Sequence, residues 1–280
     1  MDGLIEKAGG GSLARTPLLG RVELATRKEK LTGAAADPAK ICELLLACTA
    51  VLGSKICCFS DVKAYLPLLE GGAQQAFVAG VQAQLDDAAK AAEPEPAPKL
   101  IRRHIFTAEV AFFYGNGNAD TAVEGTVVVV NQLLAKYAET VPAGAELKET
   151  ELQHADPYGL LAAHYLIGLH KKTGDTVYIR RAVVVLEKLL VPSKYNAQAR
   201  LLLVKLYCLL GAANAAWPHW KECGVKQVQL DSIGHIFADY VPTLSNIKQA
   251  EMVYGKSRIF FNNTNREMPE YIINAYKHGL

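Results

Sequence analysis

The sequence lacks any hydrophobic run long enough to cross a membrane, and this absence sets the first limits on its class. A transmembrane helix needs about 20 consecutive apolar residues, whereas the valine run Val127 to Val130 already ends at Asn131. Residues 1–16 are glycine-rich and have none of the hydrophobic stretch of a secretory signal. We therefore expect a soluble, cytoplasmic protein that has no membrane partner.

Signatures of catalysis and metal binding are also missing. The chain contains no His-Glu-x-x-His, no Gly-x-Ser-x-Gly and no Cys-x-x-Cys, the spacings typical of zinc sites and nucleophile elbows. Gly115-Asn116-Gly117 resembles part of a phosphate loop, but it follows an expected helix and no Lys-Ser or Lys-Thr comes after it. We expect no catalytic residue, metal or cofactor, with an active site assembled only by folding as an open alternative.

The chain has only six cysteines in 280 residues. It lacks the export signal that would favour disulfide bonds, so we expect none. Cys57 and Cys58 are adjacent and lack the loop that would let two thiolates bind one zinc ion. We expect them to be small buried apolar residues.

An excess of one charge is absent too, because 30 Lys and Arg stand against 28 Asp and Glu. The net charge of +2 predicts no DNA partner for the chain as a whole. Three short basic clusters are nevertheless present: Lys99-Arg102-Arg103-His104, Lys171-Lys172 and Arg180-Arg181. We interpret them as solvated helix faces, with an RNA-facing ridge as the alternative.

Helical patterns are what the chain does have. Half of its residues are hydrophobic, Ala and Leu dominate, and the alternation of a strand occurs over no useful length. Asp37-Pro38 predicts a helix start. We expect a flexible segment at 1–16 and a helical-repeat domain at 17–280 with a Pro/Glu-rich loop at 93–98. Three smaller expectations are a short polar helix at 146–154, a break at 262–265 and a last helix at 269–277.

Residues 156–232 carry the strongest pattern, which predicts four helices separated by turns at Gly174, at 192–193 and at Gly211. Tetratricopeptide units are about 34 residues long and have a Leu-rich first helix, an aromatic residue, a turn glycine and an alanine. Leu203, Tyr207, Gly211 and Ala216 occupy these offsets. An earlier unit matches less well: Leu166, His170 and Gly174, with Ala182 displaced by three positions. The pattern predicts a tetratricopeptide-like α-solenoid, although an antiparallel bundle would share it.

Three segments carry a more specific pattern: YLIGLHKKTGDTVYIRRAVVVLEKLL, YNAQARLLLVKLYCLLGAANAAWPHWKECGVKQVQLDSIGHI and, near the start, GSKICCFSDVKAYLPLL. They resemble the auxiliary, non-catalytic subunits of the NatB N-terminal acetyltransferase complex. In that family Leu203, Tyr207 and Gly211 would match the repeat core. The resemblance covers most of residues 17–280.

The resemblance implies an array of tetratricopeptide-like helix pairs that cradles a separate catalytic subunit. That subunit would transfer acetyl from acetyl-CoA to nascent chains beginning Met-Asp, Met-Glu, Met-Asn or Met-Gln. The auxiliary subunit would hold no cofactor and would help position the complex at the ribosome. The Arg/Gln-x-x-Gly-x-Gly/Ala loop of the acetyltransferase subunit is absent from this sequence, in agreement.

On tetratricopeptide geometry the first helix of each pair lines the concave surface. The side chains expected there, as contacts to the catalytic subunit, are His164, Lys171, Lys172, Gln198 and Lys205. Family members are much longer than this chain, which matches an internal part of them. The alternative function is a generic helical-repeat adaptor that binds another protein or RNA.

Overall fold

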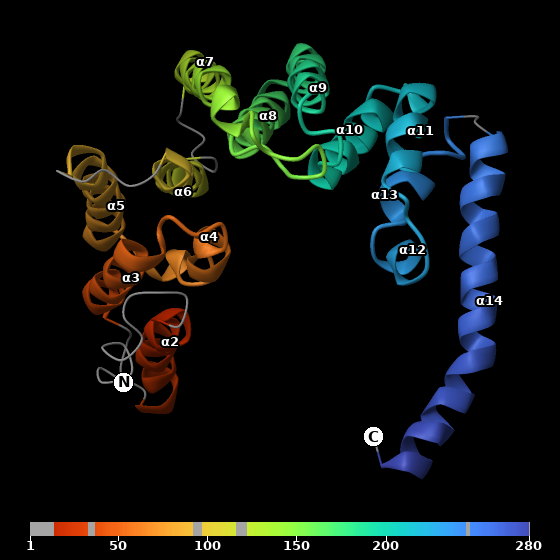
Figure 1. The fold of residues 1–280 in the computed structure, drawn as a ribbon, viewed down its shortest axis with the longest axis horizontal. Coiled ribbons are helices and arrows are strands. Elements are labelled where there is room, and N and C mark those ends of the chain that lie inside the picture. Colours follow the sequence, from red (N-terminus) through yellow and green to blue (C-terminus); the bar gives the residue numbers. More distant parts are fainter. Residues whose placement is uncertain (1–13, 33–36, 92–96, 116–121, 245–246, 280) are drawn as a thin grey trace. The chain divides into compact units, whose positions relative to one another are not determined.

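The computed structural model describes residues 14–32, 37–91, 97–115, 122–244 and 247–279. Every regular element in this described part is helical, which confirms the all-α expectation (Figure 1). None of the helices found there is both long enough and apolar enough to span a bilayer. Most of the expected flexible segment 1–16 and of the loop 93–98 lies outside the described residues.

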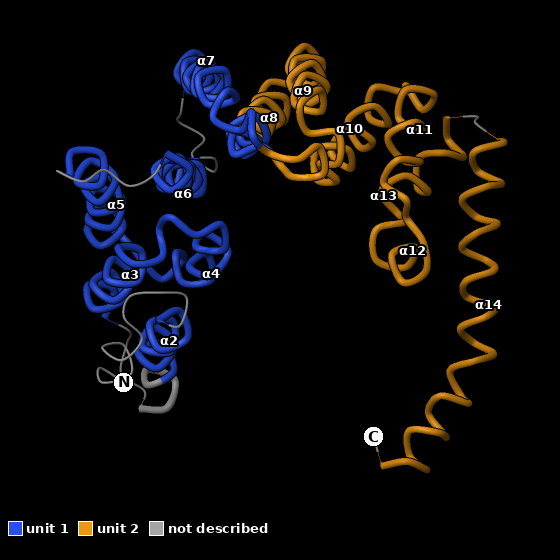
Figure 2. Tube along the Cα trace, in the orientation of Figure 1, with its two compact units in different colours: residues 1–146, 153–161 blue, residues 147–152, 162–280 orange. Residues whose placement is uncertain are grey.

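The chain divides into two compact units (Figure 2). Unit 1 comprises residues 1–146 and 153–161, and unit 2 comprises residues 147–152 and 162–280. Helix α8 (Asp156–Thr173) starts in unit 1 and continues in unit 2.

Unit 1 contains the following helices in chain order: α2 (Arg15–Thr32), α3 (Pro38–Leu52), α4 (Cys58–Val62), η2 (Leu66–Leu68), α5 (Gly72–Lys90), α6 (Ala97–Gly115), α7 (Val123–Thr140) and η3 (Val141–Gly144). α3 lies against both α2 and α5, and α5 lies against α6. Leu45 and Phe77 are fully buried in the core that these helices share. The start of α3 is as expected, because the Asp37 carboxylate accepts a hydrogen bond from the Ala39 N–H at 3.0 Å and Pro38 opens the helix.

Unit 2 continues from α8 through six more helices: α9 (Val177–Leu189), α10 (Ala197–Leu209), α11 (Ala213–Glu222), α12 (Val228–Ser232), α13 (His235–Ala238) and α14 (Ile247–His278). α10 packs against α9, α11 and α13, and α14 packs against α12 and α13. The four helices expected in 156–232 are present as α8 to α11, and a fifth helix, α12, also lies in this range. Gly174 and Gly211 form two of the three turns with φ of +73° and +74°, a conformation that favours glycine.

Three of the smaller expectations are wrong: the helix at 146–154, the break at 262–265 and the separate last helix at 269–277, which is the end of α14. Residues 146–154 form turns, not a helix, since a short polar segment buries too little to offset the cost of helix nucleation. There Glu149 forms an ion pair with Lys194. The expected break at 262–265 is also wrong, because α14 runs without interruption through the asparagines and Pro269. An asparagine lowers helix propensity by only a fraction of a kcal/mol and provides no steric stop.

Candidate interaction surface

His164 and Lys171 lie along one stripe of α8, seven residues and about two turns apart. His164 is partly exposed, and its pKa is lowered first by burial and then by the positive charge of Lys171. The two predicted contact residues are therefore close enough to interact electrostatically, and the imidazole is held neutral at physiological pH.

Lys171 and Lys172 occupy the last turn of α8, and both are exposed. Positive charges stabilise this end of a helix, where unpaired carbonyl groups give a partial negative charge. The ring of His170 is tied to the following turn through Nδ1, which lies 3.0 Å from the carbonyl oxygen of Asp175. The end of α8 thus presents two lysines to solvent on a locally fixed backbone.

Gln198 and Lys205 are exposed on α10, again seven residues apart. Leu203 and Leu206, on another face of the helix, are fully buried. The amide of Asn196 fixes the start of α10, because its Oδ1 accepts a hydrogen bond from the Ala199 N–H at 3.0 Å. Burial of one face therefore directs the two polar side chains outward.

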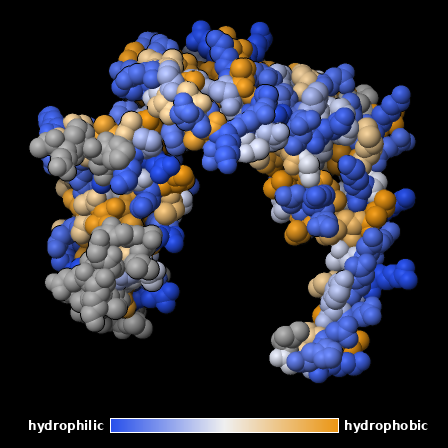
Figure 3. Space-filling model, in the orientation of Figure 1, coloured by the Kyte–Doolittle hydropathy of each residue, from blue (hydrophilic) through white to orange (hydrophobic). Residues whose placement is uncertain are grey.

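The predicted residues thus form pairs along two helices. Within the described residues, the side chains of Lys171, Gln198 and Lys205 form no hydrogen bond or ion pair, so neither Gln198 nor Lys205 bonds to α8. Hydrophobic and hydrophilic residues lie side by side on the face of the molecule that Figure 3 shows. Scattered apolar residues of this kind are normal on protein surfaces and do not single out a site.

A polar cluster that sequence reasoning missed joins three consecutive helices. Glu187 on α9 accepts hydrogen bonds from the Tyr207 hydroxyl on α10 at 2.7 Å and from Nε2 of His219 on α11 at 3.0 Å. The rings of Tyr207 and His219 stack with centroids 5.8 Å apart. Burial, followed by the hydrogen bond to Glu187, raises the pKa of Tyr207 to about 12. No sequence signal marks the cluster, because its members lie 20 and 32 residues apart.

The cluster of Glu187, Tyr207 and His219 holds α9, α10 and α11 together. The Nδ1 atom of His219 is buried and has no hydrogen-bond partner among the described residues, and no serine, threonine or cysteine shares the bonds of Glu187. A nucleophile oriented by a histidine and a carboxylate, which hydrolytic catalysis requires, is therefore not formed here.

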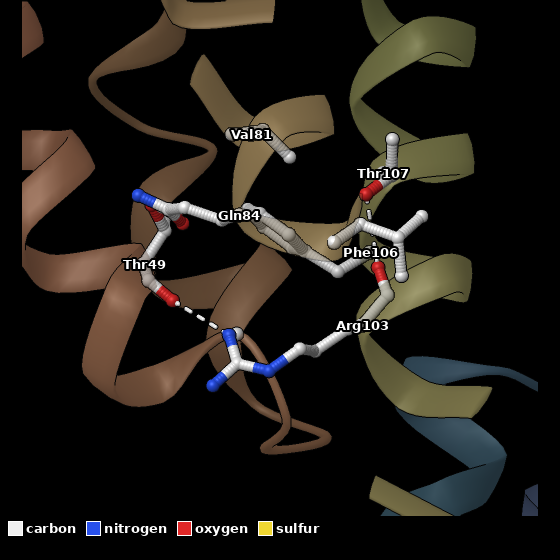
Figure 4. A pocket seen from close by; sticks show the side chains of 8 residues that line it. Thr49, Val81, Gln84, Arg103, Phe106 and Thr107 are labelled. Carbon is white, nitrogen blue, oxygen red and sulfur yellow. Dashed lines mark hydrogen bonds between the residues drawn. The ribbon is translucent and has the colours of Figure 1, made fainter. Parts of the chain in front are cut away.

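A small cavity in unit 1 also has a structural role. It holds about 10 Å³, room for one water molecule, and its lining includes Thr49, Gln84 and Arg103 (Figure 4). Arg103 Nη1 donates to the Thr49 carbonyl oxygen at 3.4 Å and Nη2 to that of Ala50 at 3.0 Å. Arg103 therefore donates hydrogen bonds to carbonyl groups at the end of α3. It does not contribute to the RNA-facing ridge that the basic cluster Lys99-Arg102-Arg103-His104 offered as an alternative.

The thiol groups agree only in part with the expectation of burial. Cys58 is fully buried, while Cys57 is partly exposed. Burial raises the pKa of the Cys48 thiol to about 11 and also raises that of Cys58, so both remain protonated. In the described part of the chain no three metal-binding side chains gather into a possible metal site.

Comparison with known proteins places this helical array in a family. A family model described as the N-acetyltransferase B complex (NatB) non-catalytic subunit matches residues 2–280. The human protein named N-alpha-acetyltransferase 25, NatB auxiliary subunit, is 30% identical over 230 residues, which cover 81% of this chain and 24% of the human protein. The Phagocyte signaling-impaired protein of Aedes aegypti is 26% identical over 276 residues, which cover 95% of this chain and 28% of the mosquito protein.

A fungal relative gives the same result. The N-terminal acetyltransferase B complex subunit arm1 of Schizosaccharomyces pombe is 24% identical over 228 residues, 79% of this chain and 27% of that protein. The chain thus spans about a quarter of the length of the curated relatives it matches. Because the family model covers nearly every residue, the chain belongs to the family of non-catalytic subunits of the NatB complex.

Proposed function

We propose that the chain acts as an auxiliary subunit of a NatB complex, binding the catalytic subunit without taking part in acetyl transfer. The family match across residues 2–280 is the observation that carries this proposal. Acetyl-CoA binds to the catalytic partner, which acetylates the N-terminal amine of nascent chains in the cytoplasm. This chain supplies a surface and holds no cofactor.

In the proposed arrangement α8 with α9 and α10 with α11 form tetratricopeptide-like antiparallel pairs. The packing of α10 on α11 supports the second pair, and the glycine turns at 174 and 211, one inside each pair, support both. α8 and α10 are then the first helices of their pairs and line the concave surface. His164, Lys171, Lys172, Gln198 and Lys205 contact the catalytic subunit from these two helices.

Co-expression with the NatB catalytic subunit of the same organism tests the proposal. Size-exclusion chromatography should show both chains eluting together at a fixed ratio, and the complex should acetylate a Met-Asp peptide. The matched control is the same co-expression with the catalytic subunit of a different N-terminal acetyltransferase complex, which should elute separately. A folded helical chain that elutes alone in both experiments would refute a working auxiliary subunit.

Ribosome association is a second part of the proposal, and the charge of unit 2 supports it. Unit 2 carries 16 Lys and Arg against 10 Asp and Glu, although the whole chain is nearly neutral. Arg180 and Arg181 lie near the start of α9, are both exposed, and are not among the residues assigned above to the catalytic subunit. Such a basic patch would contact ribosomal RNA through phosphates, and co-sedimentation with ribosomes should fall steeply as salt rises. The same steep salt dependence with free RNA, in a chain that ignores the catalytic subunit, would favour the adaptor alternative.

A further inference from the structure

Unit 2 contains a hollow of about 240 Å³ between α11, α12 and the first half of α14. Its lining joins two indole rings, Trp217 and Trp220, to apolar residues that include Val225, Leu230 and Val253. Small-molecule pockets usually measure about 300–1,000 Å³. The hollow is therefore of a size for one large apolar side chain and not for a nucleotide or a cofactor.

The apolar floor is fixed by packing against Phe237. The ring centroids of Trp217 and Trp220 lie 5.8 and 5.5 Å from that of Phe237, which is fully buried. Trp220 and Val253 are 6% and 3% exposed. Since the floor is held from behind, the hollow is preformed, and an entering side chain pays little to organise it.

Three lysines, Lys221, Lys226 and Lys256, complete the lining, and all three are exposed. None of their ammonium groups forms an ion pair or a hydrogen bond with any described residue, and no carboxylate contributes to the lining. An apolar floor surrounded by unpaired ammonium groups favours a ligand that carries an apolar side chain next to carboxylates.

We propose that this hollow binds an acidic peptide segment of a partner protein, with one aromatic or aliphatic side chain inserted between the tryptophans and α14. The flanking Asp or Glu residues pair with Lys221, Lys226 and Lys256. RNA fits less well, because Trp220 is buried and each indole already packs on Phe237, so neither ring offers a free platform for a base. This assignment does not depend on the NatB catalytic subunit.

Binding in the hollow can be followed by tryptophan fluorescence, because the only two tryptophans of the sequence, Trp217 and Trp220, both line it. A blocked peptide with a central phenylalanine between two Asp-Glu pairs is titrated into the full chain while tryptophan emission is recorded. We expect a saturable blue shift as the phenylalanine displaces water from the indoles. Two matched peptides serve as controls, one with serine for phenylalanine and one with Asn and Gln for Asp and Glu, and neither should bind comparably.

Charge reversal separates the proposed pairs from general attraction. Lys221→Glu and Lys256→Glu should each weaken peptide binding by roughly 5-fold or more, and added salt should weaken binding to the unaltered chain. Lys248→Glu makes the same charge change on an exposed residue of α14 outside the hollow and should leave binding within about 2-fold. Circular dichroism confirms that each variant is folded.

Several outcomes would overturn the proposal. They are the absence of a saturable emission change, equal binding of the neutral peptide, or equal losses in Lys248→Glu and Lys256→Glu. A single-stranded RNA oligonucleotide that displaces the peptide and binds more tightly would reassign the hollow to nucleic acid. Met252→Glu places a carboxylate on a 46% exposed lining residue, and undiminished binding by that variant would also contradict the proposed position of the peptide.

Discussion

Tyr158 and His104 meet in unit 1 through a hydrogen bond of 3.0 Å between the tyrosine hydroxyl and Nδ1 of the imidazole. Burial, and then the charge of Lys136, lower the pKa of His104, so the neutral ring accepts a hydrogen bond from the hydroxyl. The rings also contact edge to face, with centroids 5.5 Å apart. Tyr158 is 2% exposed, and its buried hydroxyl group thereby has a hydrogen-bond partner 54 positions away in the sequence.

Tyr158→Phe should lower the free energy of unfolding by about 1 kcal/mol, because it leaves the buried Nδ1 without its donor while keeping the ring. Chemical denaturation followed by circular dichroism measures the change. Tyr195→Phe is the matched control, since Tyr195 is 59% exposed and should change stability by less than about 0.5 kcal/mol. Equal effects in the two variants would contradict the role assigned to the hydrogen bond.

Glu109 gives a prediction with a defined pH dependence. Burial raises its pKa from 4.5 to about 7, so the folded protein holds a proton that the unfolded chain releases. Its favourable contribution is complete below the unfolded pKa and is lost as pH rises through the folded value. Glu109→Gln should therefore stabilise the chain above pH 7 relative to the unaltered protein, by up to about 3 kcal/mol. At pH 4 the two should differ little.

Thermal unfolding at a series of pH values tests this, with the difference between the two proteins as the readout. Glu124→Gln makes the same change at an exposed position of the next helix and controls for the loss of a carboxylate that is not buried. A pH-independent difference for Glu109→Gln would show that the carboxyl group titrates normally in the folded state.

Leu203 and Leu209 on α10 allow the effect of the same substitution to be compared at a buried and at an exposed position. Leu203 is fully buried and Leu209 is 53% exposed. Leu203→Ala should cost about 3–5 kcal/mol through lost burial and the cavity left behind, and Leu209→Ala less than about 0.5 kcal/mol. Urea denaturation measures both. A cost below about 1 kcal/mol at Leu203 would be inconsistent with the packed core between α10 and its neighbours.

Replacing glycine by alanine should change the free energy of unfolding in opposite directions at Gly211 and Gly255. Gly211 has φ of +74° in the turn after α10, so Gly211→Ala should destabilise by about 1–2 kcal/mol. Gly255 lies inside α14, and an added Cβ there meets nothing within 4 Å. Gly255→Ala should stabilise by up to about 1 kcal/mol, because alanine is the better helix former. Differential scanning calorimetry gives both shifts, and the same sign at both sites would refute the assigned conformations.

For the proposed partner surface, Lys171→Glu and Lys205→Glu together should weaken co-elution with the NatB catalytic subunit at least about 10-fold, if both lysines face the partner. Neither side chain forms a hydrogen bond or an ion pair with a described residue, and Lys171 stabilises the end of α8 only through its charge, so unfolding should change by less than about 1 kcal/mol. The control is Lys188→Glu with Lys248→Glu, two exposed lysines outside the predicted set. Undiminished co-elution of the first pair would remove Lys171 and Lys205 from the interface.

Much of unit 2 could be predicted because its information is local. Periodic leucines and the turn glycines Gly174 and Gly211 are enough to place α8 to α11. The error at 262–265 came from treating weak helix formers as a stop, although only a steric or hydrogen-bond defect ends a helix firmly. Glu187, Tyr207 and His219 could not be predicted together, because their contact depends on how α9, α10 and α11 are oriented. The hollow between α11 and α14 was missed for the same reason.

The position of the tryptophans has a consequence for how cooperative unfolding can be measured. Both Trp217 and Trp220 pack on Phe237 in unit 2, and unit 1 contains no tryptophan. Indole emission therefore follows the melting of unit 2 alone, while far-ultraviolet circular dichroism follows the helices of both units. Coincident curves would mean that the two units unfold as one cooperative block, whereas separated curves would give each unit its own transition. A chain without engineered labels can thus reveal whether its helical array melts all at once or in parts.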